Sequence, residues 1–470
     1  MRRANTPKSS VVARLGALFA DAGHDLFVVG GSVRDELLGR PTHDLDFTTD
    51  AHPDAIKRLI NAAAPHAVYT VGERFGTIGG IFGDIDVEIT TYRSEAYASH
   101  SRKPEVEFGT SLAGDLARRD FTINALARPA LGGAIVDLFG GTADLERHIV
   151  RAVGNPDERF SEDPLRLLRA VRFCAQLEFA LAEPTREAAR RQAPALRIVS
   201  RERILDELNR LLLTPHPARG LRLLADLGLA DEVLPEVVAL RQTSQGRRTK
   251  DVFEHTLAVV ENTRPELALR WSALLHDVGK PKTFVQEGGE VHFPGHEMVG
   301  ESLARGILSR LRMDHRTIDR ISRLVGLHMR ANQYEDSWTD GAVRRLVREV
   351  DDDLDLLLLL STADVTSYRQ AKRQAAADRA SRLRERVRRL EEEASIHAIK
   401  SPLDGVELMA MFGRGPGPWI RDVKDYLLEL VLEGTLGPDD KENAAELARR
   451  RLGETSASGV GPADGGREGS

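Results

Sequence analysis

The chain has 470 residues, of which 41% are hydrophobic and 29% are charged, which is enough for about three domains with buried cores. No apolar run approaches the ~18 residues that a membrane-spanning helix needs, and the one cysteine, Cys174, excludes an intramolecular disulfide and a thiolate metal cluster. The net charge of −6 argues against a generally basic surface for nucleic acid, and we expect a cytoplasmic protein without a membrane anchor.

The first part of the chain mixes short apolar runs with glycines and predicts a domain of strands and helices. Strands are expected at 26–29, 45–48, 77–82 and 85–90, and a helix is expected at 55–63.

A double glycine, Gly30-Gly31, directly follows the first of these strands, and a helix is expected to start at Ser32 and to carry Arg34. Glycines let the backbone approach phosphate oxygens closely, and the N–H groups of a helix start attract anions. Arg34 adds a charge-assisted contact. This segment therefore predicts a triphosphate site.

Carboxylates follow on the next strands. Asp44 and Asp46 are two residues apart, so both side chains emerge from one face of a strand. Such pairs hold divalent cations that bridge a triphosphate and an attacking hydroxyl. Asp84, Asp86 and Glu88 alternate in the same way. A solvated strand face is the alternative explanation, and we prefer it for Asp84.

From about residue 162 the pattern is helical almost throughout. We expect helices at 201–213 and 369–393, a polar linker at 242–249, a helical unit at 251–368 and a segment at 408–432 broken at 413–418. The tail at 454–470 has almost no apolar residues and is expected to be disordered.

The glycine segment and the Asp44/Asp46 pair together resemble the head of the polymerase-β nucleotidyltransferase superfamily. More closely, the chain is similar to the bacterial (class II) tRNA nucleotidyltransferases, the CCA-adding enzymes, and to their sister poly(A) polymerases. The resemblance implies an α+β head with an all-helical neck, HD domain and C-terminal body. It also implies Mg²⁺ at a catalytic set of Asp44, Asp46 and Glu88, the best match to the family's third carboxylate.

Two further segments carry the resemblance. Residues 118–125 resemble the block in which Asp120 contacts the ribose while Arg119 and Asn124 steady the phosphates. Asp163 and Arg166 are three apart on an expected helix and therefore adjacent, so they present a hydrogen-bonding edge that suits cytosine or adenine. A surface salt bridge is the alternative. In the family this pair stands in for a template base, and Arg203 resembles the residue that supports it.

A set of histidines and aspartates follows in the order that resembles an HD-type metal phosphohydrolase. The resemblance implies metal ligation by His255, His276, Asp277 and Asp364, with a second metal or a phosphate at His296 and His328. Imidazole and carboxylate ligands suit a transition metal or magnesium, so the identity of the metal stays open. The implied reaction is removal of 2′,3′-cyclic phosphates or 2′-phosphates from RNA ends.

The resemblance implies template-independent addition of CCA to tRNA 3′ ends from CTP and ATP. A loop at 93–106 favours complete addition, since family members that stop after CC tend to lack a working loop. Poly(A) polymerase is the nearest alternative, and a protein uridylyltransferase with an HD domain is a second. The helix at 369–390, with nine basic and two acidic residues, tracks an RNA backbone or is a solvated or dimer-contacting helix.

The domains expected from these segments are a nucleotidyltransferase head at 1–150, a neck with the nucleotide-selecting pocket at 151–245, an HD domain at 246–368, a C-terminal body at 369–453 and the tail at 454–470.

Overall fold

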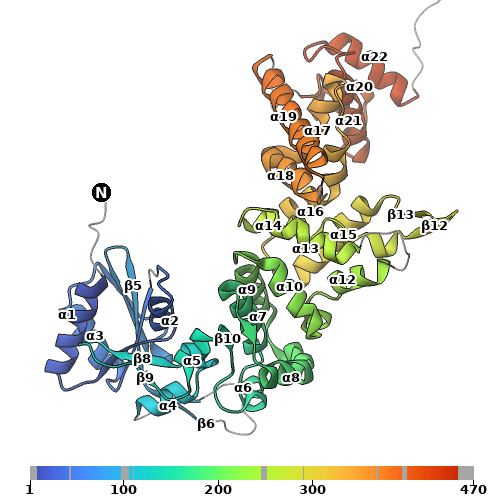
Figure 1. Cartoon of the computed structure of the whole chain (residues 1–470). Coiled ribbons are helices and arrows are strands. Elements are labelled where there is room, and N and C mark those ends of the chain that lie inside the picture. The colour runs from blue at the N-terminus through green and yellow to red at the C-terminus, as the bar shows by residue number, and fades with distance from the viewer. Residues whose placement is uncertain are drawn as a thin grey trace, which may run out of the picture. The chain divides into compact units, whose positions relative to one another are not determined.

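The computed structural model describes residues 8–41, 44–96, 105–108, 111–244, 251–288, 290–366, 369–393 and 400–453. The chain forms two compact units, one of residues 1–274 with 306–315 and one of residues 275–305 with 316–470. Figure 1 traces the elements in chain order, from the sheet of the head to the helical C-terminal part. The mixed fold, with strands first and helices after, confirms the predicted class.

Among the described residues, seven strands form the sheet of the head, in the order β3-β4-β5-β2-β1-β8-β9. They are β1 (Leu26–Val29), β2 (Asp44–Thr49), β3 (Ala67–Tyr69), β4 (Thr77–Phe82), β5 (Ile85–Thr91), β8 (Leu126–Pro129) and β9 (Val136–Asp137). The four strands predicted from sequence are confirmed to within one residue at each end. Strands β2 and β5 run parallel, and all the other pairs in this sheet are antiparallel.

Helices α1 (Lys8–Asp21) and α3 (Pro53–Ala62) pack together and contact the sheet, and Figure 1 shows them at the same side of it. The predicted helix at 55–63 is confirmed and starts with proline at its first position, where no backbone N–H is needed. Its fully buried Ile60 lies against Gly80 of β4. The opposite face of the strands is left for polar chemistry.

Shorter elements complete the head. They are α2 (Gly31–Leu37), α4 (Leu112–Ala117), α5 (Gly141–Glu146) and the pair β6 (Arg93–Ala96) with β7 (Glu105–Phe108), while β10 (Ile149–Val150), at the end of the head, pairs with β11 (Ala180–Leu181) of the neck.

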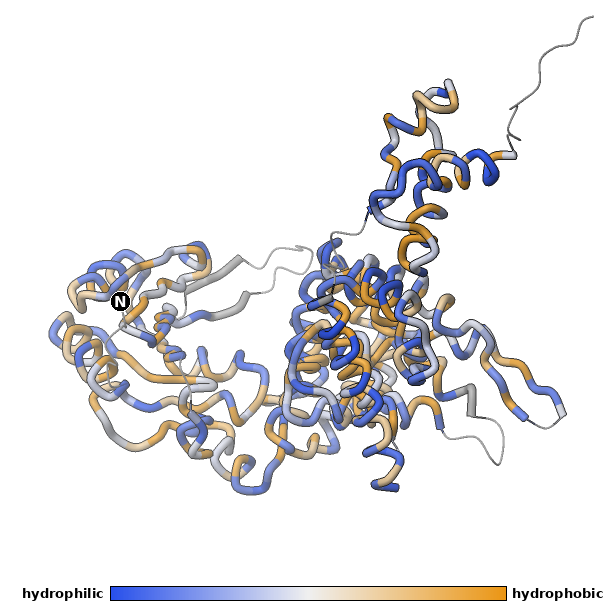
Figure 2. The backbone as a smooth tube through the Cα atoms, turned by 90° about the horizontal axis from the view of Figure 1, so that it is seen from above, coloured by the Kyte–Doolittle hydropathy of each residue, from blue (hydrophilic) through white to orange (hydrophobic). Residues whose placement is uncertain are grey.

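The neck is helical, as predicted. Its helices are α6 (Pro156–Glu162), α7 (Leu165–Leu177), α8 (Glu183–Gln192), α9 (Arg201–Leu212), α10 (Pro217–Asp226), α11 (Leu229–Val233) and α12 (Pro235–Val238). The expected helix at 201–213 begins where Ser200 caps it by accepting a hydrogen bond from the N–H of Arg203. Orange and blue stretches alternate along the helical parts of the tube in Figure 2, as expected of helices with one buried face.

The remaining helices are α13 (Val252–Glu261), α14 (Leu267–Leu275), α15 (His296–Arg310), α16 (His315–Asn332), α17 (Asp340–Val350), α18 (Leu354–Asp364), α19 (Gln370–Glu393), α20 (Gly405–Phe412), α21 (Pro418–Leu432) and α22 (Lys441–Arg451), with the hairpin β12 (Val285–Glu287) and β13 (Glu290–His292). The predicted break at 413–418 is confirmed, and Gly413 ends α20 with φ at +60°. Of the expected linker, residues 242–244 continue a 3₁₀ helix (Ala239–Ser244). Its remainder and the tail at 454–470 lie outside the described residues.

Helix α19 confirms the predicted long charged helix, and its arginines are largely paired. Arg382 contacts Asp336, Arg384 contacts Asp355, and Arg386 contacts Asp340. These ion pairs join the helix to α17, to α18 and to the turn before α17, and its contact with an RNA backbone stays a prediction. In the described residues, no helix is long and apolar enough to cross a membrane.

Candidate active site and metal centre

Four carboxylates share one face of the head sheet because of the register between β2 and β5. Asp44 lies opposite Asp86, and Asp46 lies opposite Glu88. Burial, followed by the like charges of Glu88 and Asp44, raises the pKa of Asp46 to about 6, although the cation of Arg119 acts against the shift. Burial and the neighbouring carboxylates also raise the pKa of Glu88. Negative groups that disfavour one another's charge at this spacing fit a divalent cation.

Ser32 fixes the start of β2 against helix α2. Its Oγ donates to the carbonyl oxygen of Asp44 at 3.1 Å and accepts from the N–H of Asp46 at 3.2 Å. Both predicted metal-binding aspartates are therefore held through their backbones. Gly30 has φ at +67°, and a Cβ there would lie 2.9 Å from Nη1 of Arg119. Gly30 is therefore required by backbone conformation and space.

A cavity of about 520 Å³ opens beside the glycine turn and reaches the neck. Its lining is dominated by cations, eight arginines against three aspartates. The arginines are Arg34, Arg118, Arg119, Arg166, Arg169, Arg172, Arg203 and Arg210, and the aspartates are Asp46, Asp120 and Asp163. A cavity of this charge and size suits a polyanion of nucleotide dimensions.

Asp120 is buried at the centre of a hydrogen-bond network. It accepts from Nε of Arg169 at 2.8 Å and from Nδ2 of Asn124 at 3.0 Å, and the Asn124 amide oxygen accepts from Nη1 of Arg34 at 2.7 Å. Burial alone would raise the pKa of Asp120, but the charge of Arg169 and these hydrogen bonds outweigh it and hold the pKa below its usual value. The network places Arg34 and Asn124 at the cavity.

The expected arrangement of Asp163 and Arg166 on one helix is wrong. Asp163 lies in the joint between α6 and α7, with φ at −142° and ψ at 97°, because the following Pro164 disfavours helical backbone at the residue before it. The Asp163 carboxylate accepts from Nη2 of Arg203 at 2.8 Å. Arg166 instead donates to Glu162 at 2.7 Å. Both side chains still line the cavity.

Sequence reasoning missed two further arginines of this site, Arg169 and Arg172 of α7. Arg169 pairs with Asp120 at 2.7 Å, and Arg172 pairs with the buried Glu207 at 2.7 Å. With Arg166, these arginines recur every third residue along α7. That spacing places them along one side of the helix and was the available signal.

The predicted loop at 93–106 is strand at both of its described ends. Strands β6 and β7 pair antiparallel from Arg93 with Phe108 to Ala96 with Glu105. Residues 97–104 lie outside the described residues.

A second polar cluster is buried in the HD region, where Asp277, His296 and His328 each offer a ligand atom within 4.8 Å of the others. Nδ1 of His328 lies 2.6 Å from the carbonyl oxygen of Val325, and Nδ1 of His296 lies 2.9 Å from that of Phe293. Each Nδ1 therefore carries the proton, which leaves a lone pair on Nε2.

Nε2 of His296 lies 3.5 Å from Asp277, and Nε2 of His328 is buried without a hydrogen-bond partner among the described residues. Burial, followed by the charge of His276, lowers the pKa of His328 to about 4, so this ring is neutral. A neutral imidazole with an unpaired, buried nitrogen fits a metal ligand.

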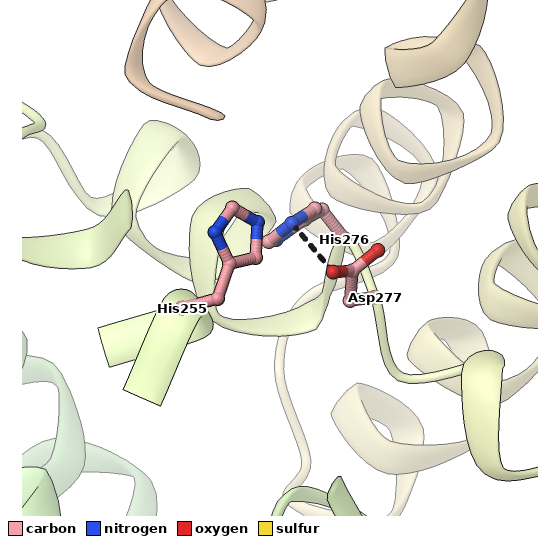
Figure 3. A group of neighbouring side chains, drawn as sticks. All are labelled: His255, His276 and Asp277. Atoms are coloured by element: carbon pink, nitrogen blue, oxygen red, sulfur yellow. Dashed lines mark ion pairs between the residues drawn. The ribbon is translucent and has the colours of Figure 1, made fainter. Parts of the chain in front are cut away.

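A second group of three shares Asp277. Figure 3 draws His255 of α13 with His276 and Asp277, and one ligand atom of each lies within 4.8 Å of the others. Nε2 of His276 is 3.1 Å from Asp277 and 3.5 Å from Asp364. Within the second compact unit the structure thus brings together five of the six predicted residues, His276, Asp277, His296, His328 and Asp364. It adds Asn332, which donates to Asp364 at 2.6 Å.

Comparisons with known proteins match these regions to three family models. The poly A polymerase head domain matches residues 26–151, the model described as "Probable RNA and SrmB- binding site of polymerase A" matches residues 178–240, and the HD domain matches residues 252–369.

Among curated proteins, the A-adding tRNA nucleotidyltransferase of Deinococcus radiodurans is 36% identical over 436 residues, 89% of this chain and 94% of that protein. The CC-adding tRNA nucleotidyltransferase of Thermus thermophilus is 34% identical over 450 residues, 93% of this chain and 96% of that protein. The CCA-adding enzyme of Lactobacillus helveticus is 45% identical over 214 residues, 45% of this chain, so the chain spans about half (52%) of that protein.

Among solved structures, the CCA-adding enzyme of Bacillus stearothermophilus in complex with CTP is similar with a TM-score of 0.67 and 26% identity, covering 95% of this chain and 98% of that one.

Proposed function

The chain belongs to the family of bacterial tRNA nucleotidyltransferases and poly(A) polymerases with an HD domain, and on that premise we propose that it adds CCA to tRNA 3′ ends from CTP and ATP without a template. The single observation that carries the proposal is the junction of two features. Asp46 shares one face of the sheet with Asp44 and Glu88, and it also lines the arginine-rich cavity. We place the reaction in the cytoplasm.

The proposed reaction joins the RNA 3′-oxygen to the α-phosphorus of the nucleotide and breaks its bond to pyrophosphate. Asp44, Asp46 and Glu88 would hold Mg²⁺, which would polarise the phosphate and lower the pKa of the attacking hydroxyl, whose proton passes to solvent. Arg34 and Arg119 bind the triphosphate at the Gly30 turn, where their charges oppose the developing negative charge of the leaving group.

Selection of the base is assigned to Asp163 and Arg166. Arg203 supports the assignment, because its contact at 2.8 Å holds the Asp163 carboxylate. Held in this way, the Asp163 carboxylate can accept a hydrogen bond from a base, and Arg166, which Glu162 holds at 2.7 Å, can donate one to it. A neighbouring RNA base is not needed for this readout, which is what template-independent addition requires.

Extension of labelled tRNA lacking CCA, with CTP alone, ATP alone and both, tests the proposal. We expect two residues with CTP, three with both nucleotides, and then arrest. Arrest after two residues with both nucleotides would make the protein a CC-adding enzyme. Extension only of tRNA already ending in CC would make it an A-adding enzyme, and a long ladder with ATP would make it a poly(A) polymerase.

Two controls test the catalytic assignment of the head carboxylates and the uridylyltransferase alternative. The double variant Asp44→Ala, Asp46→Ala is expected to lose extension completely, and retained extension would overturn the catalytic assignment. A reaction with UTP and protein substrates but without RNA tests the uridylyltransferase alternative, for which labelled protein would be the positive result.

The second candidate function is phosphohydrolysis of RNA 3′ ends at the HD cluster. The observation that favours it is the pair of buried Nε2 atoms on His296 and His328 beside Asp277. His276→Ala is expected to abolish hydrolysis of a 2′,3′-cyclic phosphate, assayed with Mg²⁺, Mn²⁺ or Ni²⁺, and to leave nucleotide addition unchanged. Loss of both activities would show that His276 has a structural role.

A further inference from the structure

One row of residues crosses the carboxylate face of the head sheet. Tyr69 of β3 pairs with Gly79 of β4, Gly79 pairs with Glu88 of β5, and Glu88 pairs with Asp46 of β2. Residues in register across a sheet point their side chains to the same face. Tyr69 therefore stands on the same face as the proposed catalytic carboxylates, at the outer edge of the row.

Gly79 makes room for the ring of Tyr69. A Cβ on Gly79 would lie 2.0 Å from Cζ and 2.1 Å from Cε2 of that ring, so the ring lies directly over the glycine backbone. The Tyr69 hydroxyl donates to Oδ1 of Asp86 at 2.6 Å. The ring is thereby held against the backbone of Gly79 and by the hydrogen bond of its hydroxyl to Asp86, and it is half-buried.

The sheet order places this ring on the opposite side of the carboxylates from the nucleotide cavity. The cavity adjoins the turn after β1, and the order β3-β4-β5-β2-β1 sets β5 and β2 between that turn and Tyr69. In phosphoryl transfer the attacking and leaving oxygens are roughly in line across the phosphorus. With pyrophosphate leaving on the cavity side, the RNA 3′-hydroxyl arrives from the side of Tyr69.

We propose that the Tyr69 ring, seated on Gly79, is the stacking surface for the base of the RNA's 3′-terminal nucleotide. This inference rests on the function proposed above. An aromatic ring suits the task because the terminal base changes with each nucleotide added. Every base has a flat face that stacks, whereas a hydrogen-bonding contact would favour one base. Asp86 acts here as the anchor of the ring.

Steady-state kinetics of extension test the proposal with tRNA lacking CCA. Because Tyr69→Ala removes the stacking of one base, it is expected to raise the KM for tRNA about 10-fold while the KM for CTP stays unchanged. Tyr69→Phe and Tyr69→Trp keep the ring and are expected to restore the tRNA KM. Val71→Ala, at a residue 89% exposed just beyond the same strand, is the surface control.

A tRNA whose terminal nucleotide lacks its base provides the matched cycle. For the wild type, the KM for this tRNA is expected to be about 10-fold higher than for the intact tRNA. For Tyr69→Ala, removal of the base is expected to cause no further rise in KM. Gly79→Ala displaces the ring and is expected to raise the KM for tRNA as much as Tyr69→Ala does. In a protein that already carries Tyr69→Ala, it is expected to raise this KM little further.

Two results would overturn the inference. One is a wild type whose KM for tRNA does not change when the terminal base is missing. Another is a loss of kcat that Tyr69→Phe shares with Tyr69→Ala, since that would make the hydroxyl's hold on Asp86 the whole role of Tyr69. A wild type that extends no RNA at all would instead overturn the proposed function, so the two failures are distinguishable.

Discussion

Replacing Asp46 by asparagine is expected to stabilise the metal-free protein while abolishing nucleotide addition. The reason is the raised pKa of Asp46, about 6 against an ordinary 3.8. Such a group binds its proton more tightly in the folded chain than in the unfolded chain. Its contribution to stability is therefore full below about pH 4 and is lost as the pH rises through about 6.

The size of the effect follows from the shift. About two pKa units correspond to about 3 kcal/mol at neutral pH, which is the free energy of unfolding that the ionised carboxylate removes. Asparagine keeps the shape of the side chain and removes its charge. Its amide is also half-buried, however, and the cost of desolvating that amide reduces the gain in stability. We expect Asp46→Asn to raise the free energy of unfolding by about 1–2 kcal/mol at pH 7.

Denaturant unfolding in EDTA, at about pH 7 and about pH 4, measures this difference. The advantage of Asp46→Asn is expected at neutral pH and is expected to vanish in acid, where the wild-type carboxyl is protonated. Asp84→Asn, at an exposed turn carboxylate, is the matched control and should leave the free energy of unfolding unchanged at both pH values. A variant that is less stable than the wild type at pH 7, or equally favoured at both pH values, would refute the reasoning.

Three further outcomes follow from the same contacts. Protons compete with Mg²⁺ at Asp46, so the Mg²⁺ concentration for half-maximal extension should rise about 10-fold per pH unit below about 6, and a flat profile would contradict this. Gly279→Ala places a Cβ 2.1 Å from the carbonyl oxygen of His296. It should lower the metal content by elemental analysis and abolish phosphohydrolysis, with CTP incorporation spared; a wild-type metal content would count against the HD assignment. Arg169→Ala leaves buried Asp120 without its cation and should cost about 2 kcal/mol of stability and raise the KM for CTP and ATP. Unchanged nucleotide KM values would show that the pair is only structural.

Local patterns account for much of what the sequence predicted correctly. Short apolar runs, three of them with a glycine within two residues, located four strands of the head within a residue, because a buried strand needs apolar side chains and tight turns favour glycine. The two-residue spacing of Asp44 and Asp46 put both on one face without any knowledge of the sheet. Resemblance to the family then selected Glu88, which the register places beside Asp46.

The incorrect prediction has a local cause as well. The spacing of Asp163 and Arg166 indicated one helix face, but Pro164 ends α6 and re-aims Asp163 toward Arg203. The proline was visible in the sequence, and its restriction on the preceding residue is the signal that the spacing argument left out.

The sequence by itself determined the order of the elements and the paired carboxylates of β2, since these depend on residue type and on spacing along one strand or helix, and its resemblance to the family supplied the six metal-binding candidates of the HD region. Only the tertiary structure decided which distant groups meet. Arg169 reaches Asp120, Asn332 reaches Asp364, and Tyr69 crosses Gly79 to Asp86. Such contacts depend on strand order and helix packing, which bring together residues far apart in the chain, and no periodicity in the sequence encodes them.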